Sequence, residues 1–224
     1  MRTVRRRAVR LSWAAGLAAC CALAAGGCSD DGTSGEHREL TDPGEGESAW
    51  HDLGGGQLPA FRLALPEDFR VVTGGAPELE GTCEAVAWRV LDGPEEGAET
   101  TTRFTLYSLD AGCPVDPQVN EHPLNGRYAA FRSAADVPDG VAADSVDTAL
   151  GRALAFTQTY TECTNSCRDF DQPSVVITLD APAAPGHQAL VLTSFRGESS
   201  EAELTRLARE QLAAADPSAD PSAA

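Results

Sequence analysis

Apolar and polar residues alternate along several stretches of the chain, and each alternation predicts a β-strand. Successive side chains of a strand point to opposite faces, so every second residue of such a stretch should be buried. The loops between the stretches are mostly too short for helical crossovers, which favours a largely antiparallel sheet. The alternating stretches are residues 61–65, 86–90, 154–160 and 175–179, and a further strand is predicted at 188–195.

The C-terminal part of the chain predicts an amphipathic helix. Ser200 and Glu203 have the spacing of a capping box, in which each side chain bonds the backbone amide of the other residue. Apolar residues then share one helical face: Leu204, Leu207, Ala208 and Leu212. A second helix is predicted over 124–135. These elements predict an α+β fold, a largely antiparallel sheet with one or two helices packed on one face in a two-layer sandwich.

The composition divides the chain into a folded domain and two flanking segments. Residues 28–57 are rich in Gly and acidic residues and contain few sizeable apolar side chains, Trp50 and Leu53 among them. Such a segment buries too little surface to fold alone, which predicts an acidic flexible tether. The low-complexity residues 214–224 predict a disordered tail. The α+β domain is therefore expected at 58–213.

The N-terminal residues have the pattern of a lipoprotein signal. Five arginines and no acidic residue lie within residues 1–10, and a small-residue apolar run covers 11–27. This order is typical of a secretory signal rather than a spanning helix. Cys28 follows the run and precedes a polar stretch, so residues 1–27 are the predicted signal peptide and Cys28 the predicted lipidated residue. Lipidation at Cys20 or Cys21, and secretion without a lipid, are the alternatives.

The charge of the processed chain restricts its partners. Cleavage before Cys28 would remove five of the 17 basic residues and none of the 34 acidic ones, which leaves a net charge of −22. Such a surface repels nucleic acid and anionic lipid headgroups. The chain has no lysine, and this bias, with the Ala, Gly and Asp content, suggests an actinobacterial source.

Four cysteines follow Cys28 in the chain, and in an exported protein they predict two disulfides. Residues 84–91 and 103–109 predict a hairpin. With Val90 near Leu106 in that hairpin, Cys83 falls opposite Cys113. Cys163 and Cys167 are close enough in sequence for one turn of chain to join them. The expected bonds are Cys83–Cys113 and Cys163–Cys167.

The segment 61–72, FRLALPEDFRVV, resembles the opening strand of PsbP-like proteins, in which alternating apolar residues are followed by a Pro, two further residues and then an aromatic residue. The matching positions here include Leu65, Pro66 and Phe69. A lipidated cysteine, an acidic tether and such a domain also resemble actinobacterial lipoproteins of the LpqN type. The resemblance covers about residues 58–213. It implies a PsbP-like fold and a non-enzymatic binding or accessory role in the envelope.

The chain has few residues in metal-binding or catalytic patterns. A zinc site at Cys163 and Cys167 lacks neighbouring histidines, and Asp169 and Asp171 could hold calcium only with ligands from elsewhere. No HExxH, GxSxG, Walker A or GxGxxG motif occurs. No cofactor is expected. The histidines, which have no metal-ligand spacing, are His37 and His51 in the tether and His122 and His187 in predicted loops.

These patterns predict an exported lipoprotein on the extracytoplasmic face of the cell membrane, anchored through Cys28. Its domain would bind envelope proteins or lipids, without catalysis and without nucleic acid. An envelope hydrolase with a spatially assembled site and a structural spacer are the alternatives. An enzyme is expected to show a deep pocket with a base and a nucleophile in hydrogen-bond reach. A binding domain is expected to show a shallow, mainly apolar groove, and a spacer no pocket.

Overall fold

The computed structural model describes residues 48–74, 85–92, 101–114, 129–163 and 166–215, without the side chains of residues 162 and 163. The chain divides into two units, Met1–His37 and Arg38–Ala224, and every described residue belongs to the second. No helix within these ranges is long and apolar enough to cross a membrane. The predicted leader with Cys28, the first part of the tether and most of the tail lie outside the described residues.

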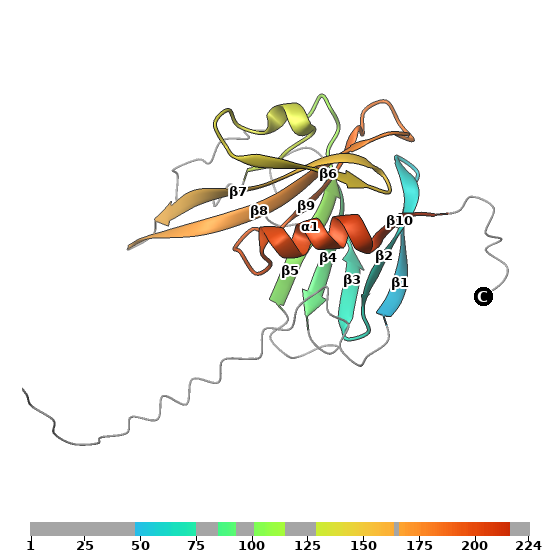
Figure 1. Ribbon diagram of the computed structural model, residues 1–224, viewed down its shortest axis with the longest axis horizontal. Helices are drawn as coiled ribbons and strands as arrows, with labels where there is room; N and C mark the ends of the chain where they lie inside the picture. Colours follow the sequence, from blue (N-terminus) through green and yellow to red (C-terminus); the bar gives the residue numbers. More distant parts are fainter. Residues whose placement is uncertain (1–47, 75–84, 93–100, 115–128, 164–165, 216–224) are drawn as a thin grey trace, which may run out of the picture. The chain divides into compact units, whose positions relative to one another are not determined.

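The described strands form two antiparallel sheets (Figure 1). The small sheet has the order β1-β2-β10, with β1 at Ser48–Gly55, β2 at Leu58–Pro66 and β10 at Leu212–Ala214. The large sheet has the order β3-β4-β5-β9-β8-β7-β6. Its strands are β3 at Phe69–Thr73, β4 at Val86–Asp92, β5 at Thr101–Ser108, β6 at Ala143–Thr148, β7 at Gly151–Cys163, β8 at Cys167–Leu179 and β9 at Ala189–Thr193.

Both faces of the large sheet are covered. On one face, its side chains form the main core with the small sheet and the helix α1, Glu201–Glu210, which packs across β6 to β9. On the other face, a second core forms around Tyr107, Phe131 and Phe156. In β9, Leu190 and Leu192 enter the main core, whereas Ala189 and Val191 enter the second. Burial on both faces explains the unbroken apolar run of this strand.

The predicted fold class is confirmed. The domain is α+β, its sheets are antiparallel, and one helix packs on one face of the large sheet. The capping box also forms as expected, since the Glu203 amide donates to Ser200 Oγ at 3.2 Å and the Ser200 amide donates to Glu203 Oε2 at 2.8 Å. Leu204, Leu207 and Ala208 of this helix are buried.

The prediction of a flexible tether over 28–57 is wrong for its last part, because Ser48–Gly55 is strand β1 and pairs along β2. The run Gly54, Gly55 and Gly56 has φ angles of +80°, +87° and +67° and makes the turn between these strands. Only glycine adopts such values without strain, so residues that looked like a linker are a turn. Leu53 packs against the main core. The described strands of the domain therefore run from Ser48, at the start of β1, to Ala214, at the end of β10.

The second predicted helix, 124–135, does not form in its described part. Residues 124–128 lie outside the description, 129–133 are not helical, and a short 3₁₀ turn covers Ala134–Asp136. Side chains of the sheet bond this backbone instead. Gln172 bonds both the amide and the carbonyl of Ala129, at 3.2 and 2.8 Å, and the Phe131 amide donates to the Tyr107 hydroxyl at 2.9 Å. These bonds compete with helical ones and hold the segment extended over the second core.

The hairpin of β4 and β5 forms with a register that differs from the expected one. Leu106 lies opposite Trp88, and Val90 lies opposite Phe104. A displacement of two residues keeps each side chain on its expected face, so alternation alone could not distinguish the two registers. The pairing also shifts between Val90 and Leu91, where the ladder is irregular.

Candidate functional site

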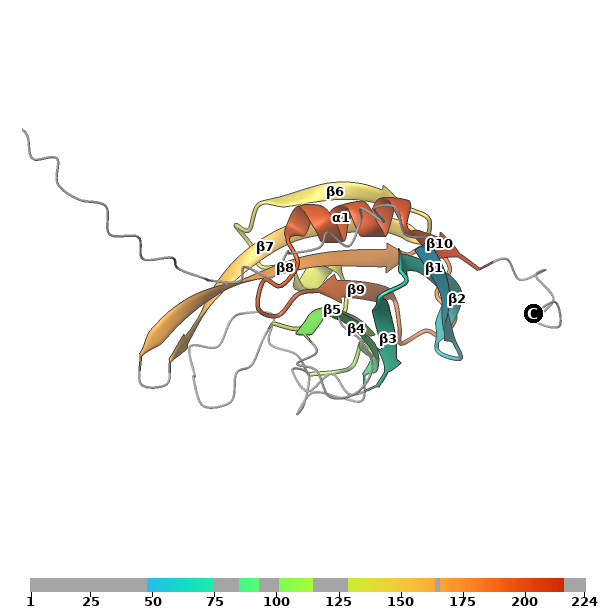
Figure 2. The same ribbon diagram turned by 90° about the horizontal axis from the view of Figure 1, so that it is seen from below.

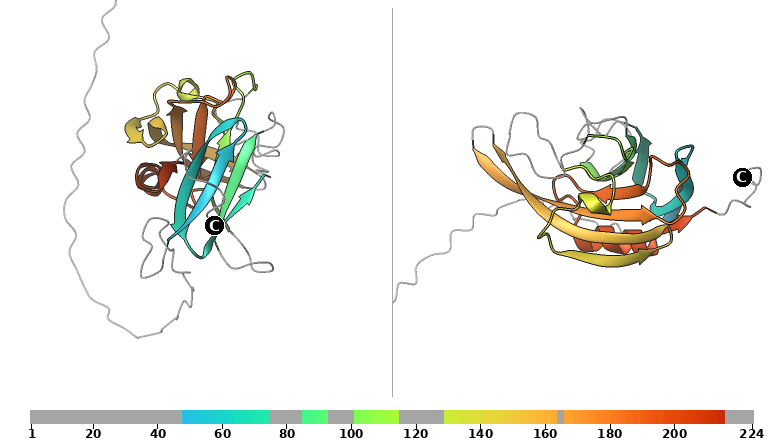
Figure 3. Two further views of the ribbon diagram at one scale, coloured as in Figure 1. Left: turned by 90° about the vertical axis from the view of Figure 1, so that its right-hand side faces the viewer. Right: turned by 90° about the horizontal axis from the view of Figure 1, so that it is seen from above.

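The hairpin of β7 and β8 extends beyond its neighbours in the large sheet (Figures 2 and 3). The two strands pair from Gly151 and Leu179 to Cys163 and Cys167. Their neighbours cover only part of this length, because β6 ends its pairing with β7 at Phe156 and β9 ends its pairing with β8 at Ser174. Residues 157–163 of β7 therefore pair with β8 alone among the described strands. The outer edge of this part of β7 borders a groove.

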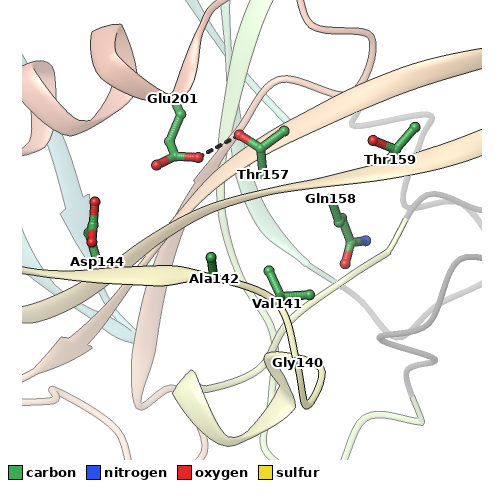
Figure 4. A pocket seen from close by; sticks show the side chains of 8 residues that line it. All are labelled: Gly140, Val141, Ala142, Asp144, Thr157, Gln158, Thr159 and Glu201. Atoms are coloured by element: carbon green, nitrogen blue, oxygen red, sulfur yellow. Dashed lines mark hydrogen bonds between the residues drawn. The ribbon is translucent and has the colours of Figure 1, made fainter.

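The groove has a volume of about 580 Å³ and lies where the chain leading into β6 diverges from β7 (Figure 4). Side chains of Thr157 and Thr159 point to one side of β7, and that of Gln158 points to the other. Since all three border the groove, the groove lies at the strand edge, in the plane of the sheet. The lining residues are Gly140, Val141, Ala142, Asp144, Thr157, Gln158, Thr159 and Glu201.

The start of α1 holds Glu201 over this edge. Arg103, which is 3% exposed, donates to the Glu198 carbonyl at 3.1 Å and to Asp92 Oδ2 at 3.2 Å, and lies 3.5 Å from Glu203 Oε1. Together with the capping box, these contacts fix where the helix begins. Glu201 is its first residue, where a carboxylate is favoured by the helix dipole. Its Oε2 accepts a hydrogen bond of 2.6 Å from Thr157 Oγ1.

Two further hydroxyl–carboxylate pairs continue along the same face of the hairpin. Thr159 donates to Asp171 and Thr161 donates to Asp169, each at 2.7 Å. Both carboxylates are thus partnered by threonines, and the described residues include no group of three His, Cys, Asp or Glu placed to hold a metal ion. The described residues therefore give no support to calcium binding at Asp169 and Asp171. On the opposite face, Tyr160 and Phe170 stack with ring centroids 5.5 Å apart.

Gln158 is the unusual residue of the groove. Its side chain is 8% exposed, and its Nε2 has no hydrogen-bond partner in the described structure. Leaving a buried amide unpaired costs about 1–3 kcal/mol. Such a donor suits a site at which a ligand supplies an acceptor. In the sequence, Gln158 is the one polar residue at an alternate position otherwise filled by Leu154, Phe156 and Tyr160. A polar residue on this buried face is the sequence feature that could have indicated the groove.

A serine and a histidine, residue types that can act as a nucleophile and its base, are hydrogen-bonded elsewhere in the described structure. Ser108 Oγ and His187 Nδ1 are 3.1 Å apart, but Ser108 is 0% and His187 4% exposed, and neither lines the groove. His187 lies in a loop as expected, between β8 and β9, and is hydrogen-bonded to Ser108 at the end of β5 from a buried position. His51 was expected in the tether and lies in β1, where partial burial lowers its pKa. His37 and His122 lie outside the described residues.

The structure describes the side chains of two of the four cysteines that were predicted to form disulfides. Cys113 and Cys167 are both disulfide-bonded. Cys113 is fully buried in the second core, whereas Cys167 is exposed at the end of the hairpin. Cys167 lies opposite Cys163 in the strand register. Cys83 and the side chain of Cys163 lie outside the description, so the pairings Cys83–Cys113 and Cys163–Cys167 stay predictions.

Comparisons of the chain with protein-family models, with curated proteins and with solved structures gave no match.

Proposed function

We propose that this chain is an exported lipoprotein, held on the extracytoplasmic face of the cell membrane through Cys28, whose domain binds a protein of the envelope without catalysing a reaction. The basic, apolar and small-residue order before Cys28 supports the anchor. The disulfide-bonded state of Cys113 and Cys167 supports export, because such bonds persist in oxidising compartments.

The groove beside β7 is the observation that carries the binding role. Five of its eight described lining residues have polar side chains, but polar and apolar surface contribute to it to a similar extent, so the groove is mixed rather than mainly apolar as expected for a binding domain. A groove of mixed polarity at a strand edge suits a polypeptide better than a lipid chain, because the edge offers backbone donors and acceptors. A protein partner is accordingly favoured over a lipid.

The buried pair of Ser108 and His187 is the one feature that favours a hydrolase. A hydrolase also needs substrate access to the nucleophile and donors for a developing oxyanion. Ser108 has no exposed surface, and the groove contains neither residue of the pair. We therefore assign the pair a packing role, in which each side chain satisfies the hydrogen-bonding group of the other.

Fatty-acid labelling tests the anchor. An alkyne fatty acid fed to cells that export the full chain should label the wild type, and labelling should be lost in Cys28→Ser. The matched controls are Cys20→Ser and Cys21→Ser, which should label normally. Labelling that is retained in Cys28→Ser would overturn the assignment of Cys28 as the lipidated residue.

A fluorophosphonate probe tests the absence of catalysis. The folded wild-type protein should not react. A reaction that disappears in Ser108→Ala would replace the binding role by a hydrolase.

A further inference from the structure

We infer that the groove accepts an extended, cationic polypeptide segment, which adds as a strand to the outer edge of β7 at residues 157–159. The inference rests on the proposed binding role and names its partner class. The site is the position that β6 would occupy if it began before Ala143, its first residue, which pairs with Phe156.

The edge of β7 at 157–159 is suited to strand addition. Every second residue of an antiparallel edge directs its amide and carbonyl outward. Sheet edges are normally protected by lysine, proline or a bulge. Residues 157–159 are Thr, Gln and Thr, and the pairing of β7 with β8 runs without a register shift from Gly151 to Cys163. The edge is therefore straight, rich in β-forming residues and unprotected by these means.

The charges around the groove select a cationic segment. Among the described residues that line it, Asp144 and Glu201 are the only ionisable ones, and none is basic. Asp171 and Asp169 continue the acidic row along the same face of the hairpin. Threonine hydroxyls occupy one oxygen each of Glu201, Asp171 and Asp169, which leaves acceptor capacity for arginine or lysine. An anionic peptide or lipid headgroup would be repelled.

The unpartnered Nε2 of Gln158 is independent support for a ligand. This donor is buried and borders the groove on the face of β7 opposite to Thr157 and Thr159 (Figure 4). A docked strand projects side chains to both faces and carries carbonyl groups along its length. It thus brings acceptors to a donor that the fold leaves without one.

A binding titration with the full exported chain tests the inference. The probe is a fluorescent peptide of alternating Arg and Val residues, and its anisotropy is measured at low ionic strength. Binding is expected, and no binding to the wild type would overturn the inference. A peptide with Glu in place of Arg should not bind. A peptide with Pro in place of Val keeps the charge but lacks half of the amides, and should bind at least fivefold more weakly.

Matched variants locate the peptide. Asp144→Asn and Glu201→Gln should each weaken binding about fivefold, the upper range for an exposed ion pair. Asp147→Asn is the control, since Asp147 lies on the same strand, is exposed and does not line the groove. An equal loss of affinity in Asp147→Asn would show that the peptide is attracted by negative charge in general, and would overturn the assignment of the peptide to the groove. Circular dichroism verifies that each variant is folded.

Hydrogen exchange separates strand addition from other modes of binding. Added protection of the amides at 157–159 by the peptide supports the inference, and protection confined to other segments overturns it. A peptide-free dimer that protects the same amides would assign the edge to a second copy of the chain and also overturn it. None of these outcomes depends on lipid labelling at Cys28 or on the fluorophosphonate result, so the inference can fail while the proposed function stands.

Discussion

Asp136 holds Arg132, and Arg132 joins two segments that cover the second core. Its carboxylate bonds the Arg132 guanidinium at 2.7 and 3.0 Å, and also the amides of Arg132 and Ser133 at 2.7 and 3.2 Å. Arg132 in turn donates to the Cys113 carbonyl at 3.0 Å. Burial by itself raises the pKa of Asp136, but the hydrogen bonds from Arg132 and Ser133 outweigh it, so that the pKa lies below the ordinary value.

Asp136→Asn should lower the free energy of unfolding by about 2 kcal/mol at neutral pH, because a bonded and mostly buried carboxylate is lost. The pKa is lower in the folded state, so the ionised group contributes stability that is complete above the unfolded value of about 4 and is lost as the pH falls through the folded value. Urea unfolding between neutral and acidic pH measures this. The difference in free energy of unfolding between Asp136→Asn and the wild type should disappear at acidic pH. Asp139→Asn, at an exposed position nearby, should change little.

Gly151 is a position where the backbone excludes a side chain. Its φ is +143°, and an added Cβ would lie 2.0 Å from the Thr178 carbonyl oxygen. Gly151→Ala should therefore cost about 3 kcal/mol through strain and displacement of β8. Gly140→Ala is the matched control, with φ of +88° and nothing within 4 Å of the added atom. It should cost about 1 kcal/mol, and equal losses in urea unfolding would contradict the steric argument.

At the scale of elements, α1 shows how packing outweighs local capping. Leu207 is fully buried in the main core, whereas Ser200 is an exposed cap. Leu207→Ala should lower the free energy of unfolding by about 3 kcal/mol, and Ser200→Ala by about 1 kcal/mol. Arg209→Ala, at an exposed position of the same helix, should stay within about 0.5 kcal/mol. Chemical denaturation measures all three, and a larger loss in Ser200→Ala than in Leu207→Ala would refute the ranking.

The strands show which elements local pattern can reveal. Alternation revealed β2, β4, β7 and β8, whose apolar residues face a core. Alternation did not reveal β1. This strand pairs along β2, and its largest apolar side chain, Trp50, is 49% exposed. An edge strand needs few apolar residues, because its neighbour supplies the hydrogen bonds. The second predicted helix failed for the related reason that Gln172 and Tyr107, distant in sequence, bond its backbone.

At the scale of the whole molecule, the disulfides should differ in accessibility. The bond of Cys113 lies in the second core, and that of Cys167 lies at the exposed end of the hairpin. Mild reductant without denaturant should therefore release Cys167 first, since exchange requires an attacking thiolate to reach the sulfur. Alkylation followed by mass spectrometry measures the order. Simultaneous release of both cysteines in the folded protein would contradict this expectation.

Peptide mapping of the unreduced chain tests the pairing itself. We expect fragments that link Cys83 to Cys113 and Cys163 to Cys167. Cys113→Ser should cost more stability than Cys167→Ser, because the bond of Cys113 is expected to close the longer loop. A fragment that links Cys113 to Cys163 or Cys167 would refute the pairing.

The sequence by itself determined the elements that depend on neighbours along the chain. Alternating or continuous apolar stretches predict five of the seven described strands of the large sheet, β4, β5, β7, β8 and β9, and the capping box with its apolar face predicts α1. These features need only local geometry, since strand and helix periodicity are properties of short segments. The sequence also placed Cys113 and Cys167 in disulfides, because an even number of cysteines in an exported chain favours bonding.

Only the tertiary structure decided where the groove lies. Its position depends on two long-range features. The pairing of β6 with β7 stops at Ala143 and Phe156 while β7 continues, and α1 brings Glu201 to Thr157, a residue 44 positions away. Neither the length of a neighbouring strand nor such a contact is encoded in local periodicity. The sequence placed Gln158 in a strand, and the long-range packing of that strand made its amide a buried donor at an open edge.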